Sequence, residues 1–336
     1  MGIHRFIGKA NLQTTLIVNS KLRKNFIQSS IFALAIASSM GTFTTMSYAV
    51  DSDASTKEWS FDSSLSRSQL EEKAAKLQKE GQKIADLETY RIGRTEKVAA
   101  VWVAFEKDEE WLYRDGMSIS TLKEEHAEHI SDGFVINEIE AIRIGANLEF
   151  SAVWTKVDDQ TETLFYWGMD ELLFSNRYGE MADRGYRLQD IEIYSGNGRD
   201  YYAAIWSPKA PEENVRFYRG LSEAVFSDMA NKMREMNFRM IDVEGYYVDD
   251  KLLFAASWEE LGEGQEALYE TSLLVDVFYQ KNAEYIAKGY RLIDFDTYAK
   301  SVSELRYAGC WVKQNVVEDS DKDKDAFIEA FRISSK

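Results

Sequence analysis

The alternation of apolar and polar residues along the chain predicts helices and strands that follow each other in a fixed order. Apolar side chains seven residues apart, such as Leu70 and Leu77, form the buried stripe of an amphipathic helix. The segment 186–194 instead alternates with a period of two, which is typical of a strand with two different faces. A short apolar run that ends at Trp206 follows this strand and predicts a buried strand that returns antiparallel.

This order of elements recurs with a fixed period, which the tryptophans show most clearly. Five tryptophans are spaced 52 or 53 residues apart, namely Trp102, Trp154, Trp206, Trp258 and Trp311. A period of this size indicates one supersecondary unit repeated in tandem, with each copy burying its apolar face against its neighbours. Small residues precede each tryptophan, as in Ala203-Ala204, and indicate that another backbone comes close to this strand.

Residues that begin and end helices also occupy fixed positions in the repeat. Before each predicted helix lies a residue whose side chain can accept a hydrogen bond from the first turn, except in the fifth copy, where the position holds Leu274. These N-cap residues are Ser66, Ser118, Asp170 and Ser222. Each helix is predicted to end at a residue that tolerates a positive φ. These residues are Gly81, Gly133, Gly185, Asn237 and Gly289.

A third strand, marked by an aromatic column, completes each unit. The column consists of Phe61, Tyr113, Phe165, Phe217 and Tyr269. We therefore expect an α+β fold of five tandem units, each one helix plus a three-stranded antiparallel meander, stacked as a curved repeat array. The predicted units span residues 66–117, 118–169, 170–221, 222–273 and 274–336, after an N-terminal partial-repeat strand in residues 50–65.

The strand around Trp59 leaves a second arrangement open. It has no helix or hairpin of its own before it, although Trp59 is in register with Trp111. This strand either caps an open array or pairs with the last unit to close a propeller-like ring. The last unit has a candidate third strand of its own at residues 327–333, which favours the open array.

Residues 1–49 predict a secretory signal peptide that is cleaved after Ala49. The stretch contains basic residues such as Arg23 and Lys24 and no acidic residue, and a short apolar run covers residues 31–40. Small residues at Ser47 and Ala49 fit a signal peptidase site. Because the apolar run is short for a membrane span, we expect a soluble, exported mature chain, either periplasmic or extracellular.

The charge of the chain argues against some classes of partner. Asp and Glu number 57 against 40 Lys and Arg, which gives a formal net charge of −17. We therefore expect no binding to nucleic acid or to anionic lipid surfaces. A protein or another cell-envelope macromolecule is the expected partner, and the oligomeric state is left open.

Two acidic columns lie two residues apart on the first strand of each hairpin, and therefore on one face of it. The ten carboxylates are Asp86, Glu88, Glu138, Glu140, Asp190, Glu192, Asp242, Glu244, Asp294 and Asp296. Such a double row attracts cations or basic groups, or else it faces water or pairs with arginines such as Arg187, Arg239 and Arg291. With the tyrosine that follows each pair, the columns give a candidate binding surface made of Asp190, Glu192, Tyr194, Asp242, Glu244, Tyr246, Asp294, Asp296 and Tyr298.

An acidic loop near the end of the chain is a candidate calcium site. Its carboxylates alternate along the sequence as Asp319, Asp321, Asp323 and Asp325. An EF-hand-like loop would have a glycine at the position of Lys324 and a glutamate at the position of Ala330, so the pattern is incomplete. A solvated acidic loop is the alternative.

Other candidate residues are better explained by folding. His126 and His129 fall in columns that are otherwise mostly apolar, and Cys310 shares a column with Val101 and its equivalents, so we expect buried packing for all three. Ser120 begins a Ser-x-x-Lys sequence, but the chain contains no Lys-Thr-Gly partner motif. We therefore expect no catalytic residue, and no cofactor apart from calcium at the acidic loop.

The motif from Gly185 to Glu192, followed by the segment 202–206, resembles the bacterial tandem repeats of secreted proteins. Similar repeats precede the serine β-lactamase-like module of fungal polyglycine hydrolases. The resemblance covers the chain from about Trp59 onward, and it implies an exported, repeat-built protein. In such relatives the catalytic serine belongs to a separate module, so the resemblance brings no catalytic residue to this sequence.

Taken together, these patterns predict a non-enzymatic exported repeat protein that binds or scaffolds a macromolecular partner through an extended aromatic and acidic surface. Two alternatives stay open. One is an accessory or degenerate hydrolase acting on peptide or cell-wall material, and the other is a calcium-binding surface protein.

Overall fold

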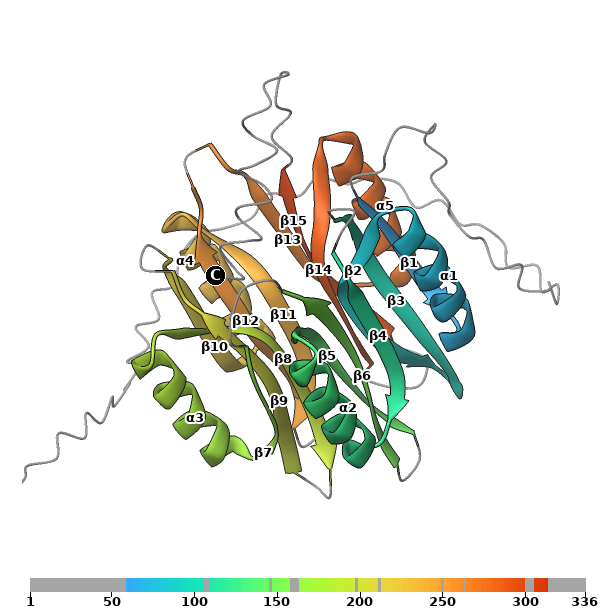
Figure 1. The fold of residues 1–336 in the computed structure, drawn as a ribbon. Coiled ribbons are helices and arrows are strands. Elements are labelled where there is room, and N and C mark those ends of the chain that lie inside the picture. Colours follow the sequence, from blue (N-terminus) through green and yellow to red (C-terminus); the bar gives the residue numbers. More distant parts are fainter. Residues whose placement is uncertain are drawn as a thin grey trace, which may run out of the picture. The chain divides into compact units, whose positions relative to one another are not determined.

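The repeat region forms five similar units, each made of one helix and one three-stranded antiparallel sheet (Figure 1). The computed structural model describes residues 59–105, 109–144, 147–157, 163–196, 199–210, 213–248, 251–262, 264–299 and 305–313. The expected α+β fold of five helix-and-sheet units is therefore confirmed. The predicted signal peptide, the acidic loop at 319–325 and the candidate strand at 327–333 lie outside the described residues.

Each unit runs in the order strand, helix, strand, strand. The first unit comprises β1 (Trp59–Leu65), α1 (Arg67–Lys79), β2 (Gln82–Ile92) and β3 (Thr95–Ala104). The second comprises β4 (Trp111–Met117), α2 (Ile119–Ser131), β5 (Phe134–Ile144) and β6 (Asn147–Lys156). The third comprises β7 (Leu164–Met169), α3 (Glu171–Asp183), β8 (Tyr186–Gly196) and β9 (Arg199–Pro208). The fourth comprises β10 (Val215–Ser222), α4 (Glu223–Glu235), β11 (Phe238–Val248) and β12 (Lys251–Glu260). The fifth comprises β13 (Ala267–Leu273), α5 (Val275–Ala287), β14 (Tyr290–Ala299) and β15 (Leu305–Lys313).

The strand pairing corrects the expected meander. In every sheet the tryptophan strand is central, the strand before the helix is its outer neighbour and the strand after the helix is its inner neighbour, as in the order β1-β3-β2. The strand that follows β3 in the chain, β4, pairs with β6 of the next unit rather than with β3. A repeated pattern defines the length of a unit but not the strand at which the unit begins, so this phase was not determined by the sequence. The strand at Trp59 is the outer strand of the first unit.

The helix boundaries agree with the predicted caps. Ser66 forms a full capping box with Gln69, and the side chains of Ser118 and Asp170 accept the backbone N–H three residues on. Ser222 takes the predicted N-cap position of the fourth helix but makes no side-chain bond there, and Leu274, which has no side-chain acceptor, caps the fifth helix without one. The helices are followed by residues of positive φ, including the non-glycine residue Asn237 with a φ of 65°.

The interior is continuous from unit to unit. The five repeated tryptophans are all at most 1% exposed. The apolar cluster around Trp154 includes Tyr194 and Ala203 of the following unit. In the same way, the cluster around Trp311 in the fifth unit includes Tyr90 and Val101 of the first unit. The side chains that recur in the repeat therefore serve folding across the boundaries between units.

The inner strands β2, β5, β8, β11 and β14 lie at the centre of the region, with helices at its periphery (Figure 1). Each inner strand contacts the inner strands of two other units, and β14 contacts β2. The rings of Phe61 and Phe295 meet with centroids 5.0 Å apart, so the first and fifth units touch. The five sheets nevertheless remain separate, and β1 pairs with β3 rather than with a strand of the fifth unit. The array is thus curved until its ends meet, without the exchanged strand of the propeller-like alternative.

Among the described residues, no helix is both long and apolar enough to cross a membrane.

Candidate functional site

The two predicted acidic rows lie on the inner strands, inside the protein rather than on its surface. Glu140 is 5% exposed and Asp296 is 4% exposed, and both belong to the buried polar residues. Carboxylates of the rows bridge neighbouring units, because they accept backbone N–H groups of an inner strand in the adjacent unit. The bonds include Ile139 N to Asp190 at 2.8 Å, Val243 N to Asp294 at 3.1 Å and Phe295 N to Asp86 at 3.0 Å.

Two of the arginines expected to neutralise these rows pair with other carboxylates. Arg187 lies 3.3 Å from Glu213, and Arg239 lies 3.2 Å from Glu259. Burial, and then the other carboxylates of the rows, therefore raise the pKa of Asp294 well above its usual value. Burial raises the pKa of Asp242 to about 7 and that of Asp296 to about 8. The rows are seams between units that resist ionisation, and seven of the ten carboxylates are buried rather than facing water.

The tyrosines of the predicted binding surface are also interior. Tyr194, Tyr246 and Tyr298 are at most 8% exposed. Their hydroxyls accept the backbone N–H groups of Gly168, Gly220 and Ser272 at 2.7 to 3.0 Å. Each acceptor fixes a residue of positive φ in the preceding outer strand. The structure thus places Asp190, Glu192, Tyr194, Asp242, Glu244, Tyr246, Asp294, Asp296 and Tyr298 on the inner strands, where Asp190, Asp294 and Asp296 bond to the neighbouring unit and the three tyrosine hydroxyls bond within their own.

The remaining sequence candidates pack as expected. Cys310 is buried, and burial followed by the nearby Asp294 raises its pKa. His126 accepts the indole N–H of Trp154 at 3.2 Å, and the ring of His129 meets the same indole edge-on. Within the described residues, no group of three or more His, Cys, Asp or Glu side chains has the arrangement of a metal site.

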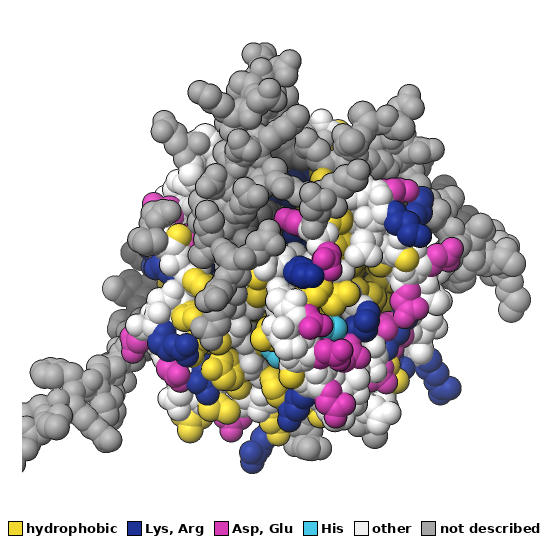
Figure 2. Space-filling view, viewed as in Figure 1, with side chains coloured by type: hydrophobic (Ala, Val, Ile, Leu, Met, Phe, Trp, Pro, Cys, Tyr) yellow, Lys and Arg dark blue, Asp and Glu magenta, His cyan; other side chains and the backbone are white. Residues whose placement is uncertain are grey.

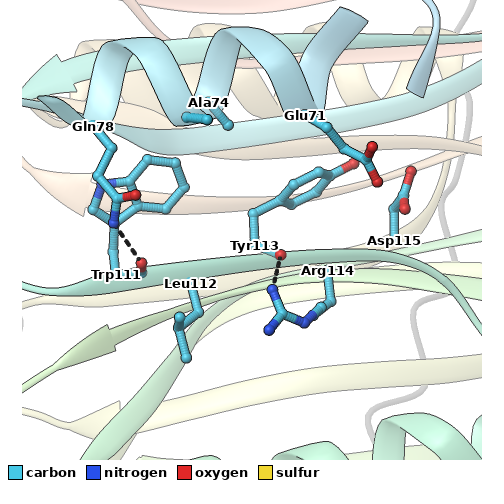
Figure 3. A pocket seen from close by; sticks show the side chains of 9 residues that line it. Glu71, Ala74, Gln78, Trp111, Leu112, Tyr113, Arg114 and Asp115 are labelled. Carbon is cyan, nitrogen blue, oxygen red and sulfur yellow. Dashed lines mark hydrogen bonds between the residues drawn. The ribbon is translucent and has the colours of Figure 1, made fainter. Parts of the chain in front are cut away.

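A groove of about 400 Å³ between α1 and β4 is a candidate site (Figure 3). Its helix wall presents side chains three or four residues apart, and its strand wall presents five consecutive residues. The lining residues are Glu71, Ala74, Ala75, Gln78, Trp111, Leu112, Tyr113, Arg114 and Asp115. The groove therefore joins an aromatic floor to carboxylate, amide and guanidinium groups, a mixture that suits ligand recognition.

The groove exists because α1 is the only one of the five described helices to combine leucine and alanine at two neighbouring inward positions, Leu70 and Ala74, whereas α4 pairs its Ala230 with the larger Phe226. In the third unit the equivalent of Ala74 is Tyr178, which packs against Phe217 of the next outer strand with ring centroids 5.5 Å apart. Phe174 contacts the same ring at 5.9 Å, whereas the first unit has Leu70 at that position. Leu70 and Ala74 leave the space beside Tyr113 unfilled.

Charged groups surround one end of the groove. Arg67 pairs with Glu96 and Glu149, and it lies 3.6 Å from Asp115. Burial raises the pKa of Asp115, and the Arg67 charge opposes that shift. The ring of Tyr113 ends beside Asp115 and Glu71 (Figure 3), and its pKa is raised first by burial and then by Asp115. The carboxylates outnumber the guanidinium groups here.

The indole N–H of Trp111 is a buried donor in the groove that has no acceptor among the described residues. The Trp111 side chain is 3% exposed. Gln78 lies across it and donates its amide to the Trp111 carbonyl at 3.0 Å (Figure 3). A buried donor without an acceptor is uncommon, so this wall of the groove has unmet hydrogen-bonding capacity.

Elsewhere the visible surface is mixed. Figure 2 shows hydrophobic side chains reaching the surface between charged side chains of both signs. The most exposed large apolar residue is Leu172 at 70%, on α3, and Leu173 beside it is 46% exposed. Isolated exposed apolar residues of this kind are ordinary on protein surfaces.

Sequence reasoning missed the groove and its residues. The available signal was the combination of Leu70 with Ala74, since the other helices place Phe174, Phe226 or Phe278 in the first column or His126 in the second. That difference in size becomes informative only when α1 is known to face the outer strand of the following unit.

Comparison with known proteins supports the repeat. The family model of the polyglycine hydrolase-like structural repeat matches residues 163–209, 215–261 and 276–314. These segments include the hairpins of the third, fourth and fifth units. A search of curated proteins found none that matches the chain.

Proposed function

We propose that this protein, which carries the polyglycine hydrolase-like structural repeat in three copies, is an exported, non-enzymatic module that binds a macromolecular partner. The groove between α1 and β4 is the proposed binding site. The observation that carries the proposal is this open, polar-lined space of about 400 Å³ at one boundary between units. Its volume falls within the range of ligand sites, about 300 to 1,000 Å³.

The rest of the repeat acts as a frame in this proposal. The residues repeated from unit to unit are buried in apolar clusters or bridge neighbouring units, so they are not available to a partner. A rigid frame lowers the entropic cost of binding, because the groove walls are held in place before the partner arrives. Export is supported by the signal-like sequence of residues 1–49.

An accessory role beside a hydrolase is the second candidate. The family description supports it, since it refers to polyglycine hydrolase, an enzyme named for a polypeptide substrate. In this role the groove would hold a polypeptide for a catalytic module located elsewhere. Both candidates place the binding at the same groove.

A groove-filling variant tests the proposal. Ala75 is an exposed helix residue that lines the groove, so Ala75→Trp should block it while the fold is retained. Ala127→Trp is the matched control, because Ala127 is the equivalent exposed residue on α2. Binding would be measured by biolayer interferometry against immobilised mixed-sequence peptides, polyglycine and soluble peptidoglycan fragments, with thermal melts to verify folding.

The expected result is that at least one probe binds the unchanged protein and the Ala127→Trp variant, and binds Ala75→Trp at least about tenfold more weakly. Equal binding to both variants would overturn the groove as the site. Release of new amino termini from the peptides by the unchanged protein would overturn the non-enzymatic assignment.

A further inference from the structure

The groove follows the free edge of a strand. Among the described strands, β4 pairs only with β6, and none of them lies along its other edge. The Glu110 carbonyl points towards β6, where it accepts the N–H of Lys156 at 2.7 Å. Because backbone groups alternate in direction along a strand, the groups of Trp111 and Tyr113 point away from β6. These two residues present their N–H and C=O groups at the free edge.

Side chains currently cover the two carbonyls at this edge. Gln78 donates to the Trp111 carbonyl at 3.0 Å, and Arg114 donates to the Tyr113 carbonyl at 2.9 Å. The side chains of Gln78 and Arg114 are exposed, so both can bond to water instead. Their displacement would leave a short ladder of backbone groups available to an incoming chain.

We propose that an extended polypeptide segment with basic side chains binds in this groove as an added strand on the free edge of β4. This inference rests on the proposed function and specifies its ligand and geometry. Main-chain hydrogen bonds to an exposed edge are an established way of binding extended peptides. The small side chains of Ala74 and Ala75 leave room for such a backbone between α1 and β4.

The excess of negative charge around the groove favours a basic segment. Glu71 and Asp115 line it, whereas Arg114 is held 3.3 Å from Glu125. Arg67 is shared among Glu96, Asp115 and Glu149, which leaves these carboxylates in excess. Lysine or arginine side chains on one face of an added strand would offset this excess.

Peptide binding to the whole chain tests the mode directly. The probe is a capped heptapeptide of alternating alanine and lysine, compared with its alanine and glutamate counterpart by fluorescence anisotropy. Two further probes carry N-methyl groups on alternate residues. In one probe the methylated nitrogens lie on the edge of the peptide that would face β4, and in the other they lie on the opposite edge. N-methylation removes a donor, so methylation on the edge that faces β4 should weaken binding about tenfold or more, and methylation on the other edge should have little effect.

Variants of the groove give the matching evidence. Asp115→Asn and Glu71→Gln should each weaken binding of the lysine probe severalfold. Each should also reduce the ratio of its affinity to that of the glutamate probe. Gln78→Ala should strengthen binding, because it uncovers the Trp111 carbonyl. Asp228→Asn, an exposed change on α4, is the control and should alter nothing.

The outcomes separate this inference from the proposed function. Equal binding of the two methylated probes, or of the lysine and glutamate probes, would overturn strand addition by a basic segment. If the lysine probe does not bind, but another polymer binds the unchanged protein and Ala75→Trp blocks that binding, only this inference is overturned. If no polymer is blocked by Ala75→Trp, both proposals fail.

Discussion

The stability of the protein should fall as the pH rises from about 4 to about 8, because the buried carboxyls of the inner strands resist ionisation. Asp242 has its pKa raised by burial from 3.8 to about 7, and Asp296 from 3.8 to about 8. An unfolded chain ionises such groups near pH 4. Between these pH values the folded state holds protons that the unfolded state has lost, so raising the pH favours unfolding.

The size of the effect follows from this proton difference. Each extra proton held by the folded state lowers the free energy of unfolding by about 1.4 kcal/mol per pH unit. Across its window, Asp242 alone therefore corresponds to a loss on the order of 4 kcal/mol. The stabilisation is fully present below pH 4 and is lost as the pH rises through the folded-state pKa. Further carboxyls of the two rows, titrating together with Asp242, would steepen the slope.

Urea denaturation at a series of pH values measures this slope, at constant ionic strength and with a chelator present. Asp242→Asn keeps an acceptor for the hydroxyl of Ser257 and removes the charge, so it should flatten the slope and raise stability at pH 8. Asp228→Asn, which is exposed, should leave the slope unchanged. A free energy of unfolding that is constant or increases between pH 5 and pH 8 would refute the reasoning.

Three further changes test other parts of the frame. Trp206→Ala should lower the free energy of unfolding by about 3 to 5 kcal/mol in urea, since the indole is 1% exposed. Tyr194→Phe should cost about 1 to 3 kcal/mol by the same assay, because the N–H of Gly168 loses its acceptor. Leu274→Ser should raise the melting temperature by supplying the absent N-cap, worth about 0.5 to 2 kcal/mol, whereas Ser66→Ala should lower it by a similar amount. No change in stability for Trp206→Ala or Tyr194→Phe, or destabilisation by Leu274→Ser, would contradict these assignments.

The sequence predicted the local elements well because local chemistry determines them. Ser66 accepts a hydrogen bond from the first turn of its helix, and Asn237 adopts a positive φ. Both depend on neighbouring residues in the sequence rather than on distant contacts. The pairing of β4 with β6 depends instead on contacts between distant segments. Periodicity contains no information on that choice.

The candidate site was harder to predict for a related reason. Alternation along 186–194 shows that Asp190, Glu192 and Tyr194 share a face, but not whether that face meets water or the next unit. Here it meets the preceding inner strand, whose backbone N–H groups the carboxylates satisfy. The groove depends on Ala74 facing Tyr113 across a boundary between units, which only the fold brings together.

Amide hydrogen exchange at Phe295 tests most directly whether the five units share one interior up to the contact between the ends. The Phe295 N–H donates to Asp86, which lies 209 residues earlier in the chain. We predict slow exchange at Phe295 in the unchanged protein and faster exchange in Asp86→Ala, just as Asp190→Ala should accelerate exchange at Ile139. Fast exchange at Phe295 in the unchanged protein, or exchange that Asp86→Ala does not alter, would contradict the account.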